Sequence, residues 1–490
     1  MKYIVAEIPN KIGVNYGMLG NNLPSPARSI ELIQSMKFSR VKLYDANPEV
    51  LNLLSGTKLQ ASIMVQNHEI SGIGSSQAIA DEWVRNNVLL YYPDTIISFI
   101  LVGNEVLSST LDQDRELWRD LVPAMRRIRA SLRAKGIRTI KVSTPLAMDV
   151  VESTFPPSSA KFRSDISESV MEPLLRFLNG TRSHFFVDVY PYFPWSGDPT
   201  NIDLDFALLQ GNYTYTDPGS RLVYTNLLDQ MLDSITFAMS KLGYEKIPLV
   251  IAETGWPNGG DLDQSGVNVH NAAIYNRNLI KKLTAKPPSG TPARPGVNIP
   301  TFIFSLYDED QKTGPGSERH WGLLHPNGTS IYEIDLTGKR PISQYKSLPL
   351  PTNNEPCKGE LWCVVAREAN LTELRLAIEY ACASGNGTCD ALMPGGECQE
   401  PVSEYLRASY AFSSFWARFR SQGATCYFNG LAEQTTSNPS ESFLDLFECI
   451  FLGSLSFSFL SIEIDRDDMV VDPARSRALR FEDEEIKSSL

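Results

Sequence analysis

No cysteine precedes Cys357 in this 490-residue chain, so a thiol nucleophile is not expected before that position. The five histidines form no His-Glu-x-x-His motif, which argues against a zinc hydrolase. A P-loop, a Gly-x-Ser-x-Gly nucleophile elbow and a Gly-x-Gly-x-x-Gly dinucleotide motif are also missing. We therefore expect neither a metal nor an organic cofactor.

Positive charge and long apolar runs are both scarce. Lys and Arg number 45 against 57 acidic residues, which gives a net charge of −12. With no Lys/Arg-rich block or basic helix identified, this balance argues against a nucleic-acid partner. No apolar run approaches the roughly 18 residues of a membrane-spanning helix, so no transmembrane span is predicted.

Several features bear on the compartment in which the chain is made. All seven cysteines lie between Cys357 and Cys449, which is typical of a disulfide-stapled module formed in an oxidising compartment. Asn-x-Ser/Thr sequons also fit secretion; they begin at Asn179, Asn212, Asn327, Asn370 and Asn386. Segment 1–7 lacks the apolar core of a signal peptide, and we expect a truncated start rather than a cytosolic protein.

Eight apolar or alternating runs recur between residues 11 and 340, with helix-like segments between them. The predicted strands are 11–17, 40–45, 60–66, 97–105, 139–147, 185–193, 248–255 and 301–308. The predicted helices include 26–36, 77–92, 115–135 and 224–242. Alternating strands and helices form a parallel sheet, and eight repeats over this length predict a closed (β/α)8 TIM barrel. An open doubly wound sheet is the alternative.

Two of the predicted strands end in a glutamate. Segment 248–257 reads Pro-Leu-Val-Ile-Ala-Glu-Thr-Gly-Trp-Pro and places Glu253 at the end of a short buried strand. Segment 97–105 ends in Val-Gly-Asn-Glu and places Glu105 at the end of the fourth strand. Both carboxylates would then lie in the barrel mouth, where such barrels carry their active sites. A pair of carboxylates in this position indicates cleavage of a glycosidic bond, with retention or inversion depending on their separation.

Further polar and aromatic residues are predicted at strand ends around this mouth. Asn104 could hydrogen-bond a sugar 2-hydroxyl, and the loop after the eighth strand combines carboxylates, an ammonium and an indole. The alternatives are a solvated, salt-bridged loop for that segment and simple core packing for the aromatics. The predicted substrate-binding residues are Tyr44, Asn104, Tyr190, Tyr192, Trp256, Glu309, Lys312, Glu318 and Trp321.

The composition changes after the predicted barrel domain, which spans residues 10–342. Segment 343–360 is polar and rich in proline, which predicts a linker. Segment 361–451 contains six of the cysteines and predicts a compact domain. Segment 452–490 begins apolar and then becomes strongly charged, and we expect it to be disordered.

The motifs of the barrel region occur in the order typical of one family. They are Ile-Gly-Val-Asn-Tyr-Gly17, Val-Gly-Asn-Glu105, Val-Tyr-Pro-Tyr-Phe193, Ala-Glu-Thr-Gly-Trp-Pro257 and the 309–321 loop. The chain resembles the plant glucan endo-1,3-β-glucosidases of glycoside hydrolase family 17. That resemblance implies a retaining mechanism with Glu253 as nucleophile and Glu105 as acid/base, supported by Glu309, Lys312 and Glu318. Two departures are Asp188, where Asn is common, and Trp321, where Phe is common.

The cysteine-rich segment resembles the X8-type, family-43 carbohydrate-binding module, which binds β-1,3-glucan. The matching pieces include Leu361-Trp-Cys-Val-Val365 and Ala424-Thr-Cys-Tyr-Phe428. The resemblance implies a small, mainly helical domain and leaves Cys357 unpaired. The implied disulfides are Cys363–Cys426, Cys382–Cys389 and Cys398–Cys449. The aromatic residues Tyr410, Phe415 and Trp416 have the spacing of a helix packed into the core, and we predict core positions for them.

Taken together, the resemblances imply an enzyme that hydrolyses internal 1,3-β-D-glucosidic bonds of β-1,3-glucan, such as callose or laminarin. We also expect a monomer. The alternative is a non-catalytic β-1,3-glucan-binding protein of the cell wall. A secreted protein, extracellular or in the cell wall, is expected. Relatives with this domain order often carry a C-terminal lipid-anchor signal. Here the apolar tract stops at Glu463 and a charged tail follows, so no anchor is expected.

Overall fold

The computed structural model describes residues 12–108, 114–367, 369–385, 387–396 and 403–437. The chain divides into two compact units. The first comprises Met1–Asn258, Val267–Asp310 and His320–Thr352; the second comprises Gly259–Gly266, Gln311–Arg319 and Asn353–Leu490. The tail predicted at 452–490 lies outside the described residues. Within the described ranges, no helix combines the length and apolarity that crossing a membrane requires.

The first unit is a parallel β-barrel. Its strand order is β5-β4-β3-β2-β1-β13-β10-β7-β6, and neighbouring strands run parallel. Only Thr144 separates β5 (Lys141–Ser143) from β6 (Pro145–Ala147), so these are two halves of one strand that links β4 to β7. The remaining strands are β1 (Ile12–Tyr16), β2 (Arg40–Leu43), β3 (Gln60–Val65), β4 (Ile96–Val102), β7 (Phe185–Asp188), β10 (Leu249–Thr254) and β13 (Thr301–Ile303). The predicted TIM barrel is confirmed.

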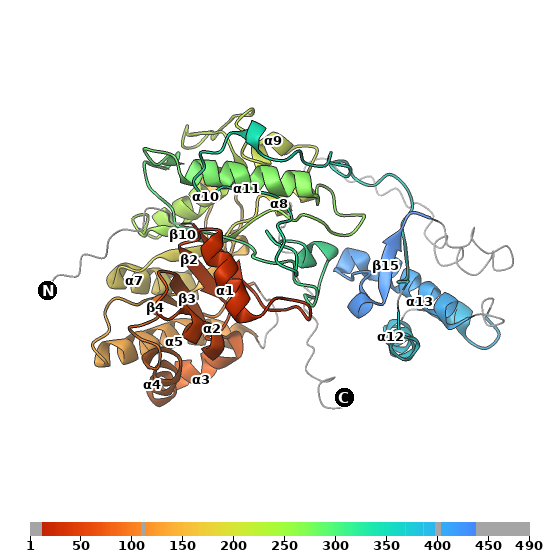
Figure 1. Cartoon of the computed structure of the whole chain (residues 1–490), viewed down its shortest axis with the longest axis horizontal. Helices are drawn as coiled ribbons and strands as arrows, with labels where there is room; N and C mark the ends of the chain where they lie inside the picture. Colours follow the sequence, from red (N-terminus) through yellow and green to blue (C-terminus); the bar gives the residue numbers. More distant parts are fainter. Residues whose placement is uncertain (1–11, 109–113, 368, 386, 397–402, 438–490) are drawn as a thin grey trace. The chain divides into compact units, whose positions relative to one another are not determined.

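Helices lie outside these strands (Figure 1). They include α1 (Pro26–Ser35), α2 (Pro48–Leu54), α3 (Ile70–Ser75), α4 (Gln77–Val84), α5 (Asp114–Ala134), α7 (Glu172–Thr181), α8 (Tyr192–Gly197), α10 (Leu227–Lys241) and α11 (Val269–Leu283). Several begin at an asparagine whose side chain accepts a backbone N–H of the first turn: Asn47 for α2, Asn226 for α10 and Asn268 for α11. Each cap satisfies a donor that the helix itself leaves unpaired.

Alternation along the strands produces two separate apolar layers. One set of side chains packs inside the barrel: Met64, Phe99, Leu101, Phe186, Val250, Ala252 and Phe302. The alternate residues, such as Val41, Leu43 and Ile63, belong to the larger layer between strands and helices. Because successive side chains of a strand point to opposite faces, Lys42 and Tyr44 share the inner face.

Three predicted strands extend at least three residues beyond the observed ones. β4 ends at Val102, where Gly103 turns the chain with a φ of +70°, so Glu105 lies in the following loop. β7 ends at Asp188, and Tyr192 opens helix α8 instead of continuing the strand. β13 ends at Ile303 rather than Asp308. The residues that follow these strands, Glu105 among them, therefore belong to loops or to α8 and not to the ladder.

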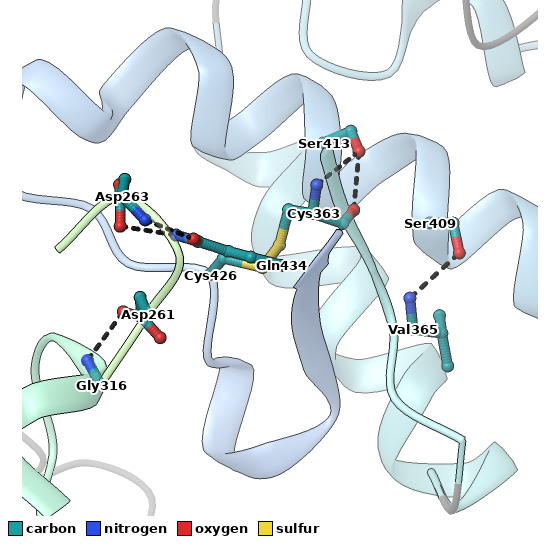
Figure 2. The surroundings of a disulfide bond; sticks show 9 residues. All are labelled: Asp261, Asp263, Gly316, Cys363, Val365, Ser409, Ser413, Cys426 and Gln434. Atoms are coloured by element: carbon teal, nitrogen blue, oxygen red, sulfur yellow. Dashed lines mark hydrogen bonds between the residues drawn. A yellow bond between two sulfur atoms is a disulfide. The ribbon is translucent and has the colours of Figure 1, made fainter. Parts of the chain in front are cut away.

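In the second unit, a two-stranded sheet packs with helices. β14 (Trp362–Val365) pairs antiparallel with β15 (Ala432–Thr435), and the helices are α12 (Leu371–Ala383) and α13 (Glu404–Phe419). Two serines of α13 bind one edge of β14: Ser409 accepts the Val365 N–H at 3.1 Å, and Ser413 accepts the N–H of Cys363 at 3.1 Å (Figure 2). As predicted, Tyr410, Phe415 and Trp416 are buried in its core.

The two segments Gly259–Gly266 and Gln311–Arg319 are part of this unit. Asp263 and Gln434 exchange two hydrogen bonds: the Asp263 N–H donates at 3.3 Å, and the Gln434 amide donates back at 3.1 Å (Figure 2). The Arg319 guanidinium lies 3.6 Å from the ring centroid of Tyr427. A cation over an aromatic face is attracted by the ring quadrupole. Gln434 and Tyr427 thus contact two segments that the sequence analysis places in the barrel domain.

Two disulfides join described residues of the second unit. Cys363 pairs with Cys426, and Cys382 pairs with Cys389. Both are among the pairs that the family resemblance implies. Cys357 is a free, exposed thiol. The third implied pair, Cys398–Cys449, lies outside the described residues.

Opening the Cys363–Cys426 disulfide is expected to destabilise the second unit more than opening Cys382–Cys389. The two bonds close segments of 63 and 7 residues. Loop-closure entropy then gives about 4 kcal/mol for the long loop and about 2.5 kcal/mol for the short one. Thermal unfolding of the double variants Cys363→Ala/Cys426→Ala and Cys382→Ala/Cys389→Ala would measure the difference. Equal losses in the two variants would contradict this ranking.

Candidate active site

Glu253 enters the barrel through an irregularity in strand β10. The register between β10 and β7 runs from Ile251–Val187 to Glu253–Asp188, so β10 has one extra residue there. The register with β13 shifts in the same place. Val250 and Ala252 already point inward, and regular alternation would turn Glu253 outward. The bulge therefore reverses the alternation and directs the Glu253 carboxylate into the barrel.

Three side chains donate hydrogen bonds to that carboxylate. The Lys42 ammonium lies 2.6 Å from Oε1, and the Tyr44 hydroxyl lies 2.6 Å from the same oxygen. The Tyr190 hydroxyl donates to Oε2 at 2.7 Å. Lys42 is completely buried and Glu253 is 6% exposed, so the charge of each is compensated mainly by the other. Oε2 accepts one of these bonds, whereas Oε1 accepts two.

These contacts decide the ionisation of Glu253. Burial raises the pKa of a carboxyl group, but here the charge of Lys42 and the hydrogen bonds from Lys42, Tyr190 and Tyr44 outweigh burial and lower the pKa of Glu253. Burial and the Glu253 charge raise the pKa of both Tyr44 and Tyr190 well above the ordinary phenol value. Both phenols are therefore neutral donors, and Glu253 is an ionised carboxylate.

Asn15 is a further hydrogen-bond partner of Tyr44. Its amide nitrogen donates to the carbonyl oxygens of Ala252 at 3.2 Å and Ile303 at 3.3 Å. Its oxygen lies 3.1 Å from the Tyr44 hydroxyl. Asn15 thus ties β1 to both β10 and β13 on the inner face of the barrel. The Tyr44 ring, with the Lys42 ammonium 4.1 Å from its centroid, is held between this amide and Glu253.

The second predicted acid lies in the loop after β4. Glu105 is half-buried, and its backbone φ is +49°. This value lies in the left-handed region, which residues other than glycine seldom adopt. Its N–H donates to the Pro145 carbonyl at 3.1 Å, which anchors the loop to β6. Such backbone strain persists where the surroundings impose it, and it is concentrated at functional sites.

Asn104 precedes Glu105 and is fixed by Asn67. The Asn67 oxygen accepts the Asn104 N–H at 2.8 Å, and the Asn67 amide donates to the Asn104 carbonyl at 3.2 Å. Within the described residues, the buried side-chain oxygen of Asn104 has no hydrogen-bond partner. This oxygen is therefore available to accept a hydroxyl hydrogen from a ligand.

The predicted aromatic residues gather around Tyr190. The Trp321 ring centroid lies 4.9 Å from that of Tyr190 and 6.0 Å from that of Tyr192. Trp256 packs against Tyr192 at 5.3 Å and is only 1% exposed. Tyr192 and Trp321 are each 2% exposed. A ring with so little exposed surface offers no face on which a sugar could stack, so these three residues support the positions of the site residues.

The acidic residues of the 309–321 loop are divided between the two units. Glu309 belongs to the first unit, is 2% exposed and accepts the Leu19 N–H at 2.8 Å. Gly17 faces the same carboxylate so closely that a Cβ there would overlap it. Lys312 and Glu318 belong to the second unit, where the Lys312 carbonyl accepts from Arg319 at 3.1 Å. Their role at the Glu253 site stays a prediction.

Lys42 and Asn15 are site residues that the sequence analysis does not identify. Both occupy inward positions between apolar neighbours that face outward: Lys42 lies between Val41 and Leu43, and Asn15 lies between Val14 and Tyr16. A lysine in the inward register of a buried strand is the signal that could have located the counter-charge of Glu253.

Among the described residues, no cluster of three His, Cys, Asp or Glu side chains could hold a metal ion.

Comparison with known proteins supplies independent evidence. The model of glycosyl hydrolases family 17 matches residues 12–336, and the X8 domain matches residues 361–433. A probable glucan endo-1,3-beta-glucosidase A6 of Arabidopsis thaliana is 59% identical over 433 residues, covering 88% of this chain and 90% of the relative. A glucan endo-1,3-beta-D-glucosidase of Olea europaea is 36% identical over 88% of this chain and 91% of the relative.

Solved structures agree with this match. The β-1,3-glucanase and pollen allergen CJP38 of Cryptomeria japonica has 38% identity and a TM-score of 0.62, covering 66% of this chain and 99% of that one. A structure described among plant β-glucan endohydrolases has 33% identity, a TM-score of 0.60 and the same coverage. With its barrel, its family match and these relatives, the chain belongs to glycosyl hydrolases family 17 and carries an X8 domain.

Proposed function

We propose that this protein is a retaining glycoside hydrolase that cleaves internal 1,3-β-D-glucosidic bonds of β-1,3-glucan. The observation that carries the proposal is the Glu253 carboxylate, which is ionised, buried and aligned by three donors within a family 17 barrel. Relatives described as glucan endo-1,3-beta-glucosidases support the choice of substrate. A non-catalytic glucan-binding protein would have no use for a charge pair buried at the barrel centre.

In the first chemical step, a carboxylate oxygen of Glu253 attacks the anomeric carbon of the sugar. Oε2 is the better placed nucleophile, because it accepts one hydrogen bond and Oε1 accepts two. The bond from the anomeric carbon to the leaving oxygen breaks, and that oxygen takes a proton from the Glu105 carboxylic acid. The products are a glycosyl ester on Glu253 and a shortened glucan.

Water completes the reaction in the second step. Glu105, now a carboxylate, takes a proton from water while the water oxygen bonds to the anomeric carbon. The ester bond breaks and its electron pair returns to Glu253. Asn104 is the residue we assign to the sugar 2-hydroxyl, since its buried side-chain oxygen has no partner among the described residues. Two displacements at one carbon leave the β configuration unchanged.

The product anomer tests this proposal directly. Cleavage of laminarin, followed by proton NMR within the first minutes, should show β-configured reducing ends that equilibrate later. Internal cleavage should also shorten the average polymer length faster than it releases glucose. An α-configured first product would exclude the Glu253 ester, and no reducing ends at all would favour the binding-protein alternative.

Secretion and a wall location follow from the same proposal. Disulfides persist in oxidising compartments, and the second unit has two between described residues. We assign to the X8 domain the task of holding the enzyme on insoluble β-1,3-glucan. Two linked binding sites raise the effective concentration of the polymer without any change in the barrel site.

Truncation after Thr352 is expected to weaken retention on insoluble β-1,3-glucan while hydrolysis of short soluble oligosaccharides stays nearly unchanged. Co-sedimentation with the polymer and kcat/KM on a laminari-oligosaccharide measure the two effects. Loss of activity on the oligosaccharide would instead show that Gln311–Arg319, which carries Lys312 and Glu318, depends on Gln434 and Tyr427 for its shape. A Gln434→Ala/Tyr427→Ala variant of the full chain would then reproduce that loss.

A further inference from the structure

A cavity lies at the opposite end of the barrel from Glu253. Its lining residues lie within 129–141 and 180–182, where helices α5 and α7 end and the chain returns to the strands. The volume of the cavity is about 270 Å³. Lys141 opens strand β5, so the cavity lies at the amino ends of the strands. Active sites of such barrels use the carboxyl ends. This cavity therefore has no part in the glycosidase site.

Its lining is strongly basic in a chain of net charge −12. The cationic residues of the lining are Arg129, Arg133, Arg138, Lys141 and Arg182. Segment 125–141 contains seven Lys or Arg and no acidic residue. This finding corrects the expectation that the chain has no basic block. Arg129 and Arg133 are one helical turn apart on α5, so they share one face of it.

These cations face one another rather than carboxylates. Within the described part of the chain, none of the five lies in a salt bridge. Burial, then the charge of Arg133, lowers the pKa of Arg129. Burial, then the charges of Arg129 and Arg182, lowers the pKa of Lys141. Five like charges around one cavity are mutually repulsive, and an anion between them would relieve that repulsion.

A purely structural explanation accounts for part of this arrangement. Cations at helix carboxyl ends compensate the helix dipole, and the Lys141 ammonium donates to the Thr181 carbonyl at 3.4 Å. That role explains Lys141 and one arginine per helix end. It does not explain why arginines from α5, the α5–β5 connection and the residue after α7 all line the same hollow.

We propose that this basic cavity binds an anionic saccharide, namely a chain of uronic acid units whose carboxylates pair with the arginines. Arginine presents a planar fork of donors that matches a carboxylate. The cavity volume of about 270 Å³ is close to the lower limit for small-ligand pockets, which is about 300 Å³. A cavity of this size is larger than a single oxyanion requires. The choice of a saccharide rests on the proposed polysaccharide-degrading function, because an enzyme of a glucan matrix meets other polysaccharides there.

Binding of an oligomer of galacturonic acid to the full-length protein tests the proposal. A neutral 1,4-linked glucose oligomer of equal length and inorganic phosphate serve as comparison probes. The test variant is Arg133→Gln/Arg138→Gln, since both side chains are exposed and their loss leaves the core intact. The matched control is Arg85→Gln, an exposed arginine paired with Glu82 elsewhere on the barrel. Laminarin hydrolysis is measured in parallel for every variant.

We expect the uronic acid oligomer to bind, the neutral oligomer not to bind, and affinity to fall as salt is added. Arg133→Gln/Arg138→Gln should weaken binding at least about tenfold, with Arg85→Gln and all laminarin activities unchanged. Unaltered binding in the double variant, or equal binding of the neutral oligomer, would overturn the proposal. Phosphate that binds as tightly as the oligomer would also overturn it, in favour of a small oxyanion site. If the wild type did not hydrolyse laminarin, the proposed function would be rejected, whereas the result on binding of the uronic acid oligomer would still stand.

Because Asn179 begins a sequon beside this cavity, its glycosylation state enters the experiment. The side chain is exposed near the end of α7, next to Gly180 and Thr181 of the lining. A glycan there would stand at the rim of the cavity. Binding is therefore measured for the wild type and for Asn179→Gln, and binding by either protein supports the site. Absence of binding in both overturns it.

Discussion

Replacing Glu253 with alanine is expected to reduce the turnover of laminarin by several orders of magnitude. The covalent route is lost with the nucleophile, whereas the family barrel and its aromatic packing remain. Replacing Glu105 with alanine should give a loss of similar order, because the leaving oxygen then has no proton donor. Reducing-sugar release and circular dichroism measure activity and folding, with the exposed Glu168→Ala as control. A Glu253→Ala enzyme with near wild-type activity would refute the assignment.

Added azide distinguishes the two roles. In Glu253→Ala the small anion fits the space of the lost carboxylate and attacks the sugar directly, so an α-glycosyl azide is expected. In Glu105→Ala the Glu253 ester still forms from a substrate with a good leaving group, and azide then yields the β-glycosyl azide. The opposite pair of products would mean that the roles of the two glutamates are exchanged.

Replacing Lys42 with methionine is expected to have the second-largest effect. The change leaves the Glu253 carboxylate buried without its counter-charge, and breaking a buried pair in this way costs about 3–5 kcal/mol. Burial would then dominate and raise the pKa of Glu253. The acidic limb of the kcat/KM profile, which reports ionisation of the nucleophile, should move to higher pH.

The stability of the two proteins should respond to pH in opposite directions. In the wild type the pKa of Glu253 is lowered by folding, so its stabilising contribution is present above the ordinary carboxyl pKa and fades as pH falls. In Lys42→Met the pKa would be raised, and stability from this group would be lost as pH rises. Melting temperatures measured from about pH 3 to about pH 8 cover both trends. Tyr190→Phe is the control, since it removes a donor to Glu253 but no charge.

The barrel could be predicted from the sequence, because periodic apolar runs depend on local pattern alone. The roles of Glu253 and Glu105 stay predictions that rest on their positions after two of these runs and on the family resemblance. The sequence does not identify how Glu253 reaches the interior. Regular alternation from Val250 and Ala252 would place that carboxylate among the outer residues, and only the pairing of β10 with two neighbours creates the bulge. Bulges arise from contacts between segments distant in sequence, so local pattern cannot reveal them.

Neither Lys42 nor the basic cavity follows from the sequence analysis, for two different reasons. Local pattern does not distinguish a lysine that faces the barrel centre from one that faces solvent, and only the contacts of Lys42 and its neighbours show that it faces the centre. The basic residues of segment 125–141 do not show in the net charge, because acidic residues outnumber basic ones in the chain as a whole. The predicted strands extend past β7 and β13 because apolar residues continue beyond the last ladder hydrogen bond, and past β4 because nothing in the local pattern marks the turn at Gly103 as the strand end. For Lys42 and for the strand ends the deciding information is three-dimensional, whereas the basic block of 125–141 is visible in the sequence itself.

The buried ion pair of Lys42 and Glu253 also bears on the lifetime of the covalent intermediate. An ester carries no charge, so formation of the glycosyl-enzyme leaves the fully buried Lys42 ammonium without the anion 2.6 Å away that balances it. A lone buried cation is costly, and hydrolysis of the ester restores the balance. The resting pair therefore favours discharge of the intermediate, which would keep the enzyme from accumulating in a glycosylated form between successive cuts of the polymer.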